Sequence, residues 1–236
     1  MICNDLAYVL HTRPYRETSQ LVSVYTRGQG RFSLVARGSR GGKKTQPLQS
    51  FCRFQIAWSG TADLKTLTGA ELVEHRVLLG RNLYIGLYLN ELLTRLGQDF
   101  HPAERIFDLY TLLVARLAEA GDSEALLRSF EWQLLEELGC GFALDREAAT
   151  GEPVTAAGRY RFDPQRGLLC ARGDSGPGCF RGDDLLALAR GDLSRQPTRL
   201  AAKQLMRLAL QPHLGARPLL SRELFRGAID SGGARA

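Results

Sequence analysis

The sequence predicts an α+β protein in which a small β-barrel precedes a helical domain that carries an irregular insert. Three observations support this fold class. Short runs of apolar and β-branched residues, separated by turn-forming residues, fill the first 80 positions. From residue 81 the apolar side chains recur with the helical period instead. Between residues 141 and 180 both periods are lost while glycine and proline recur, which indicates loops and a hairpin.

Short strands are expected throughout the first 80 residues, and they are Leu6–His11, Gln20–Thr26, Arg31–Ala36, Phe51–Trp58 and Leu64–Thr68. Gly28 and Gly30 mark a hairpin turn between the second and third of them. In the third strand every second residue is apolar, so one face is expected to be buried while the other carries arginine. Such strands fit a small closed barrel, with the OB-fold as the leading candidate; an SH3-like barrel fits the same pattern.

Helices are expected in the rest of the chain, at 83–96, 106–117, 122–138, 183–189 and 198–211. Inside the insert, Tyr160–Phe162 and Leu168–Cys170 are expected to form short strands. The expected domains are therefore a barrel over residues 1–80 and a helical domain over residues 81–236, with the insert at about 141–180.

Charge is distributed unevenly along the 236 residues, although the net charge is only +6. The first 80 residues hold 11 basic and 5 acidic side chains, residues 81–150 hold 6 and 12, and residues 151–236 hold 14 and 8. Between His11 and Lys44 the single acid is Glu17. This local excess of arginine and lysine predicts a nucleic-acid partner, because a polyanion gains binding free energy from counterion release. A solvated basic face without a partner is the alternative explanation.

Known catalytic and metal-binding motifs are absent from the sequence. It contains no P-loop, no GxSxG, no HExxH and no kinase signature. Its 4 histidines are far apart and its 5 cysteines include no CxxC pair. We therefore expect a binding protein with no catalytic residue, no cofactor and no metal. A metal-dependent nuclease with scattered carboxylates, or an RNA-binding barrel protein of the translation machinery, is the alternative.

The location is also predicted from what the sequence lacks. No stretch approaches the roughly 20 apolar residues of a membrane-spanning helix. The first residues include Asp5 and show no basic-then-apolar signal pattern. A cytoplasmic protein without a membrane partner is therefore expected.

Several short strings follow one another along the chain: Val9–Leu21, Tyr25–Arg27, Ala36–Arg40, Leu48–Phe51, Leu67–Glu71, Tyr88–Leu93, Arg128–Glu131, Ala202–Lys203 and Ser221–Phe225. In content and order they resemble the RecO family of bacterial recombination mediators, over about residues 6–226. The resemblance implies an N-terminal OB-fold and a helical C-terminal domain. It also implies binding of single- and double-stranded DNA, annealing of complementary strands, and no catalytic activity.

The resemblance further implies partners and a place of action. The family acts with RecR on DNA coated by single-strand-binding protein, so that RecA is loaded, and RecF is a possible further partner. Association with the nucleoid in the cytoplasm follows from these roles. The expected DNA-binding residues are Arg13, Arg16, Arg27, Arg31, Arg37, Arg40, Lys43 and Lys44. Tyr15 could stack on a base or serve in packing.

A second site is implied on the helical domain, where the family docks the acidic, apolar C-terminal tail of single-strand-binding protein. Such a tail requires an apolar pocket and cations for its carboxylates. Arg128 occupies the family's matching position, and three basic residues four positions apart form a nearby stripe. The expected tail-binding residues are Arg128, Leu135, Arg199, Lys203 and Arg207. A plain core position is the alternative for Leu135.

One departure from the family concerns zinc. Many members carry two CxxC pairs in the insert, and the aligned positions here are Glu147, Thr150, Cys170 and Gly173. One thiolate cannot replace the four ligands of a structural zinc ion. We therefore expect no zinc, and an insert held by the packing of its own apolar residues.

Overall fold

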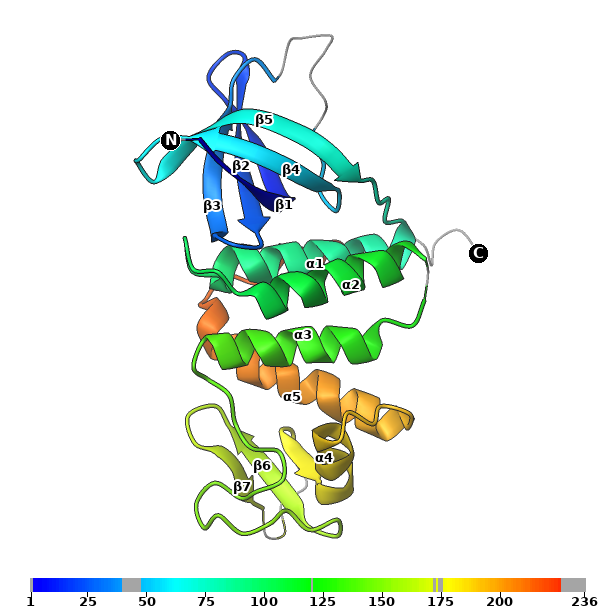
Figure 1. Ribbon diagram of the computed structural model, residues 1–236. Helices are drawn as coiled ribbons and strands as arrows, with labels where there is room; N and C mark the ends of the chain where they lie inside the picture. The colour runs from blue at the N-terminus through cyan, green and yellow to red at the C-terminus, as the bar shows by residue number, and fades with distance from the viewer. Residues whose placement is uncertain (1, 40–47, 120, 172, 174–175, 226–236) are drawn as a thin grey trace. The chain divides into compact units, whose positions relative to one another are not determined.

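The computed structural model describes residues 2–39, 48–119, 121–171, 173 and 176–225 (Figure 1). The chain divides into two compact units. The first comprises residues 1–121 together with the chain from residue 217 onward, and the second comprises residues 122–216. The boundary expected at residue 80 coincides with the start of the first helix, α1 (Gly80–Leu96), which belongs to the same unit as the barrel. The division into domains at residue 80 stays a prediction.

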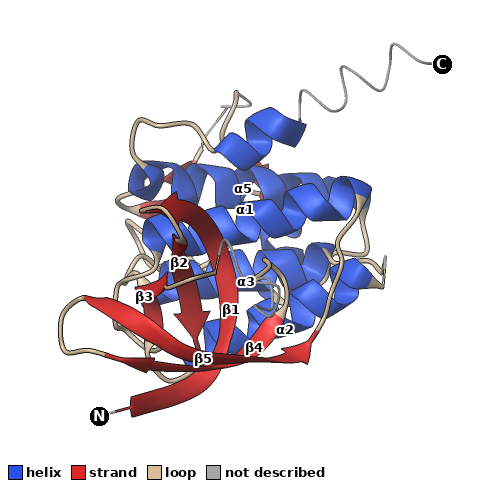
Figure 2. Cartoon of the chain, turned by 90° about the horizontal axis from the view of Figure 1, so that it is seen from above, coloured by secondary structure: helices blue, strands red, loops and turns tan. Residues whose placement is uncertain are grey.

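Five strands form a closed barrel in the order β1-β2-β3-β5-β4 (Figure 2). They are β1 (Ile2–Tyr15), β2 (Ser19–Thr26), β3 (Gly30–Ala36), β4 (Arg53–Ser59) and β5 (Leu64–Glu74). Neighbouring strands are antiparallel except β3 and β5, whose parallel pairing closes the barrel. This closed five-stranded architecture confirms the expected OB-like barrel.

The interior of the barrel follows from the alternation of apolar residues in the strands. In β3 the side chains of Phe32 and Leu34 point inward, and in β4 those of Phe54, Ile56 and Trp58 do. Each of these side chains is almost completely buried. Burial of a large apolar side chain contributes about 1.5–3 kcal/mol, so this cluster stabilises the barrel.

Strand β1 is longer than the sequence predicts. Residues 2–8 pair with β4 and residues 7–15 pair with β2, and the β1–β2 pairing has an irregularity between Val9 and His11, just after the pairing with β4 ends. Such a bulge bends the strand and allows one strand to serve two sides of a barrel. The extra length was not expected because Asn4, Asp5 and Pro14 are poor strand formers. Strand β5 likewise extends beyond the expected end at Thr68.

Helix α1 and helix α2 (Glu104–Ala118) complete the first unit beside the barrel. A buried polar chain connects them to β1: the hydroxyl of Tyr110 donates to Asn90 Oδ1 at 2.5 Å, and Asn90 Nδ2 donates to the carbonyl of Leu10 at 3.0 Å. Gly86 allows α1 to lie close to the side chains of Leu78 and Phe51, because a Cβ at this position would be 2.5 Å from Leu78 and 2.7 Å from Phe51. These contacts fix the position of the helices on the barrel.

The chain returns to α1 after residue 216. The carboxylate of Glu91 accepts hydrogen bonds from the backbone nitrogens of Leu220 and Ser221, both at 3.0 Å, and from Ser221 Oγ at 2.7 Å. Arg95, one turn later, donates to the carbonyls of Arg217 and Pro218. Burial opposes ionisation of Glu91, but the hydrogen bonds from Ser221, Leu220 and Arg95 outweigh it and hold its pKa below the ordinary value.

The second unit contains three helices and a small sheet. The helices are α3 (Glu124–Glu137), α4 (Gly182–Ala189) and α5 (Gln196–Leu214), and both α3 and α4 pack against α5. The sheet has the order β7-β6-β8 and consists of β6 (Arg159–Asp163), β7 (Gly167–Cys170) and β8 (Cys179–Arg181). The expected hairpin is present, whereas β8 was not expected because it spans only three residues after a glycine-rich stretch.

A buried hydrogen bond connects α4 and α5. Thr198 Oγ1 donates to Asp184 Oδ1 at 2.8 Å, and both side chains are shielded from solvent. A charged acceptor makes such a bond stronger than a neutral pair. Among the described residues, no helix combines the length and the apolar character that crossing a membrane requires.

Candidate nucleic-acid interface

The described arginines of β1, β2, β3 and their adjoining turns lie at two opposite ends of this three-stranded part of the barrel. At one end Tyr15 pairs with Ser19 and Gln20 pairs with Ala36. At the other end Thr26 pairs with Gly30. The strand register therefore places Arg13, Arg16 and Arg37 toward the first end, and Arg27 and Arg31 toward the second.

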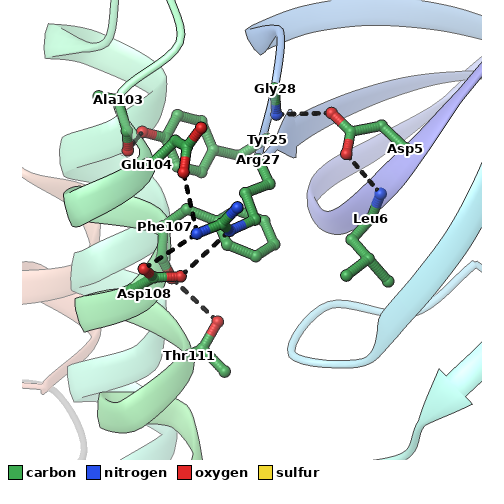
Figure 3. A network of polar contacts seen from close by, with 10 residues as sticks. All are labelled: Asp5, Leu6, Tyr25, Arg27, Gly28, Ala103, Glu104, Phe107, Asp108 and Thr111. Carbon is green, nitrogen blue, oxygen red and sulfur yellow. Dashed lines mark hydrogen bonds and ion pairs between the residues drawn. The ribbon is translucent and has the colours of Figure 1, made fainter.

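At the second end Arg27 is bound to acidic residues of α2 (Figure 3). Its terminal nitrogen lies 2.9 Å from Glu104 Oε2, and its Nε lies 3.4 Å from Asp108 Oδ1. The hydrogen bond with Asp108, followed by the charges of Asp108 and Glu104, raises the pKa of Arg27. Beside it Tyr25 stacks on Phe107 and donates to the carbonyl of Ala103. This end of the barrel is therefore attached to α2.

Arg31 also contacts an acidic residue outside the barrel strands. Its terminal nitrogen lies 2.8 Å from Asp99 Oδ1 and its Nε donates to the carbonyl of Gly97 at 3.1 Å. Its side chain is 22 % exposed. The sequence grouped Arg27 and Arg31 with the other arginines and did not identify their counter-ions, although the acidic excess in residues 81–150 was a signal for them. A role of either residue in DNA binding stays a prediction, and a phosphate would compete with these carboxylates.

The first end presents arginines without counter-ions. Arg13, Arg16 and Arg37 are exposed. Within the described ranges none of them forms an ion pair. The guanidinium of Arg16 lies 5.2 Å from the centroid of the half-buried Tyr15 ring, in the turn between β1 and β2. Cationic groups and a half-buried aromatic ring are thus combined at one place.

The outer face beside this turn mixes basic and apolar side chains. Arg13 lies opposite Leu21, and Leu21 lies opposite Val35, so these three residues form a row across β1, β2 and β3. Leu21 and Val35 are half-buried. In OB-folds the β2–β3 face and the β1–β2 loop bind oligonucleotides. Apolar side chains beside cations fit single strands, because bases need stacking surfaces and phosphates need positive charge.

Three of the expected DNA-binding residues, Arg40, Lys43 and Lys44, lie outside the described residues. They follow Arg37 in the sequence. Their participation stays a prediction.

In the second unit the expected tail-binding residues lie on two packed helices. Arg128 on α3 is 9 % exposed and pairs with Glu131, with 2.5 Å between Nη1 and Oε2. Its Nε is buried and has no hydrogen-bond partner in the part of the chain described. Leu135, two turns later, is 1 % exposed and belongs to the core. The structure thus places a buried guanidinium that is paired with Glu131 on the same helix as the buried Leu135.

The basic stripe on α5 is only partly free. Arg199 donates from Nε to the carbonyl of Leu193 at 2.6 Å and lies 3.8 Å from Asp122 Oδ2. Lys203 and Arg207 are exposed and follow Arg199 at intervals of four residues, so they share its face of the helix. These residues stay predicted contacts of the tail.

The residues aligned with the family's zinc ligands do not fit a zinc ion. The buried carboxylate of Glu147 accepts hydrogen bonds on Oε2 from the backbone nitrogens of Ala149 and Thr150 and from Thr150 Oγ1, and on Oε1 from Cys170 N. The Thr150 hydroxyl, followed by these backbone donors, holds the pKa of Glu147 below its ordinary value despite burial. Both aligned segments therefore direct N–H and O–H groups at one carboxylate, and Cys170 is the single thiol among the four aligned positions, whereas a structural zinc ion takes four ligands. Among the described residues no group of three His, Cys, Asp or Glu side chains is arranged to hold a metal.

Comparison with known proteins identifies the family. The family model described as "Recombination protein O N terminal" matches residues 1–76, and "Recombination protein O C terminal" matches residues 80–223. The chain is 46% identical over 228 residues to a DNA repair protein RecO of Stutzerimonas stutzeri, covering 95% of this chain and 94% of that protein. It is 45% identical over 225 residues to RecO of Pseudomonas aeruginosa, covering 95% of each chain. It is 46% identical over 223 residues to RecO of Pseudomonas putida, covering 93% and 96%. The chain, with its OB-like barrel and helical second part, therefore belongs to the RecO family of DNA repair proteins.

Proposed function

We propose that this member of the RecO family binds single- and double-stranded DNA at the exposed end of its barrel. The observation that carries the proposal is the convergence of Arg13, Arg16 and Arg37 at the β1–β2 end, without an acidic partner among the described residues. Guanidinium groups bind phosphate oxygens in a bidentate manner, and each contact releases counterions. Leu21 and Tyr15 supply surfaces on which bases can stack.

On this surface the protein anneals complementary strands, and it does so without catalysis. Neutralising the phosphates of two strands lowers their mutual repulsion, so pairing needs no nucleotide hydrolysis. The absence of a P-loop from the sequence agrees with such a mechanism. Together with RecR, the protein then helps RecA to load on DNA coated by single-strand-binding protein.

The coat protein is engaged through its acidic C-terminal tail on α3 and α5. Arg128, with its unpaired Nε, and the exposed Lys203 and Arg207 supply cations for the carboxylates of the tail. Leu135 is buried, so it contacts an apolar tail residue only if the core beside α3 opens on binding. Arg199 supports the same face from its position next to Asp122.

Strand annealing followed by fluorescence tests this function. Complementary oligonucleotides are precoated with single-strand-binding protein, in EDTA and without nucleotide. The double variant Arg13→Ala/Arg37→Ala is compared with Arg81→Ala/Arg105→Ala, which removes two exposed arginines from the helices of the same unit. We expect slower annealing only in the first variant, and a salt slope for single-strand binding that falls by about 0.7 for each lost phosphate contact.

Equal behaviour of the two double variants would reject the barrel end as the DNA site. The same reagents separate the alternatives raised by the sequence. A nuclease would shorten labelled DNA when Mg²⁺ replaces EDTA. An RNA-binding protein would prefer RNA over DNA of the same sequence, because only RNA offers the 2′-hydroxyl.

A further inference from the structure

The small sheet of the second unit has one buried face and one exposed face. Tyr160 and Phe162 of β6 and Phe180 of β8 are buried. Because side chains alternate along a strand, the residues between them point to the opposite face. That face carries three arginines from β6 and β8, which we call the arginine face: Arg159, Arg161 and Arg181.

Two of these arginines lie directly opposite each other. Arg159 of β6 pairs with Arg181 of β8 in the antiparallel register. Like charges at directly opposite positions destabilise a sheet. Arg181 is neutralised by Asp183, with Nε and a terminal nitrogen 2.9 and 3.1 Å from its carboxylate oxygens. Arg159 is exposed and has no ion-pair partner in the ranges that the structure describes. Folding stability therefore does not account for Arg159.

The surroundings of the arginine face favour a polyanion. Leu169 and Cys179 lie opposite Arg161 in the register, and neither of them is a carboxylate. Asp163, at the end of β6, uses its carboxylate to accept from the backbone nitrogens of Gln165 and Arg166 in the turn.

The spacing of the arginines also favours a polyanion. Arg159 and Arg161 are two residues apart, which on a strand is about 6.6–6.8 Å, comparable to the spacing of successive phosphates on an extended nucleic-acid strand.

We propose that the arginine face is a second nucleic-acid backbone site, which holds the second of the two strands during annealing. The inference rests on the proposed function and refines it, because it assigns one of the two annealing strands to the barrel end and the other to the arginine face. The site reads no sequence, since it contacts phosphates alone. It lies in the second unit and is separate from the barrel residues Arg13 and Arg37, which bind the first strand.

Two single neutralisations in the full chain test the proposal. Arg159→Ser removes the unpaired arginine of the face, and Arg190→Ser removes an equally exposed arginine at the end of α4 in the same unit. Bridging is measured as energy transfer between two non-complementary oligonucleotides with different dyes. We expect Arg159→Ser to weaken bridging about three- to tenfold, to slow annealing, and to lower the salt slope of bridging by about 0.7. Affinity for one labelled strand should change less than about twofold, because the barrel is unaltered.

Thermal unfolding checks that the Arg159→Ser variant still folds. Because Arg159 is exposed and has no ion-pair partner among the described residues, Arg159→Ser should keep the wild-type Tm. Equal bridging by Arg159→Ser and Arg190→Ser would overturn the proposal. Loss of binding to an acidic peptide with normal DNA bridging would also overturn it, because the face would then serve a protein partner. Failure of the proposed function is recognised separately, as unchanged single-strand binding in Arg13→Ala/Arg37→Ala.

Discussion

Asp108 of α2 accepts hydrogen bonds from both Nε and a terminal nitrogen of Arg27, each at 3.4 Å, across 81 residues of sequence. This pair joins the β2–β3 turn to the helices. The arginines of β1, β2, β3 and their turns fall into two groups: Arg27 and Arg31 have carboxylate partners, while Arg13, Arg16 and Arg37 are exposed and have none among the described residues.

Loss of the Asp108 charge should have a small effect on stability. Both side chains of the pair are about half exposed, so Asp108→Asn should lower the free energy of unfolding by about 0.2–1 kcal/mol. Urea unfolding at low and high salt measures this difference, which should shrink in 1 M salt because exposed charges are screened. A salt-independent loss would contradict the assignment of an electrostatic contact.

Glu147 should be required for the stability of the second unit, whereas metal should not. Glu147→Ala leaves the donors of Thr150 and Cys170 without their acceptor, which costs about 1–3 kcal/mol. Glu152→Ala, an exposed neighbour, is the control. Thermal unfolding of both variants and of the wild type is compared with and without EDTA. A fall in the wild-type Tm on chelation would show that a metal stabilises the insert.

The contact of Glu91 with Ser221 should make the free energy of unfolding depend on pH in the acidic range. Because the pKa of Glu91 is lowered in the folded protein, its contribution is complete above the unfolded value of about 4.3 and is lost as pH falls through the folded value. Urea unfolding between pH 3 and pH 7 should therefore show a flatter acid limb for Glu91→Gln than for the wild type. Glu223→Gln, which neutralises an exposed carboxylate of the same segment, should keep the wild-type slope.

The hydrogen bond between Thr198 and Asp184 should be the main polar connection of α4 to α5. Thr198→Val keeps the shape of the side chain but removes the donor, which should cost about 1–3 kcal/mol because Asp184 stays buried. Thr198→Ser keeps the hydroxyl and should lose less. Hydrogen exchange of α4 reports the effect locally, and equal protection in both variants would argue against it.

Local sequence patterns predicted the barrel and the helices well, because these elements depend on periodicity. The alternation of Phe32 and Leu34, for example, specifies a half-buried strand regardless of its partners. Patterns failed where geometry is set by distant residues. The length of β1 depends on pairing with both β2 and β4, and β8 exists only because Arg159–Arg161 of β6 offers it an edge.

The sequence predicted that the candidate site is rich in arginine, but it did not predict how these arginines are arranged in the fold. A run of arginines indicates a polyanion, but it does not say which of them have acidic partners elsewhere in the chain. Asp99 is 68 residues from Arg31 in sequence, and their contact requires the folded barrel. The arginine face was missed for a similar reason, since Arg159 and Arg181 become neighbours only through strand register.

The return of the chain to α1 has a consequence for synthesis on the ribosome. Domains generally fold in the order in which they emerge, N-terminal first. Glu91, however, meets Ser221 across 130 residues, so its carboxylate remains without those donors until almost the whole chain has been translated. The barrel and α1 must therefore wait in an incomplete state while residues 122–216 are made. A stop codon before residue 217 should yield a nascent product that is more accessible to proteases and chaperones than its near-complete length would suggest.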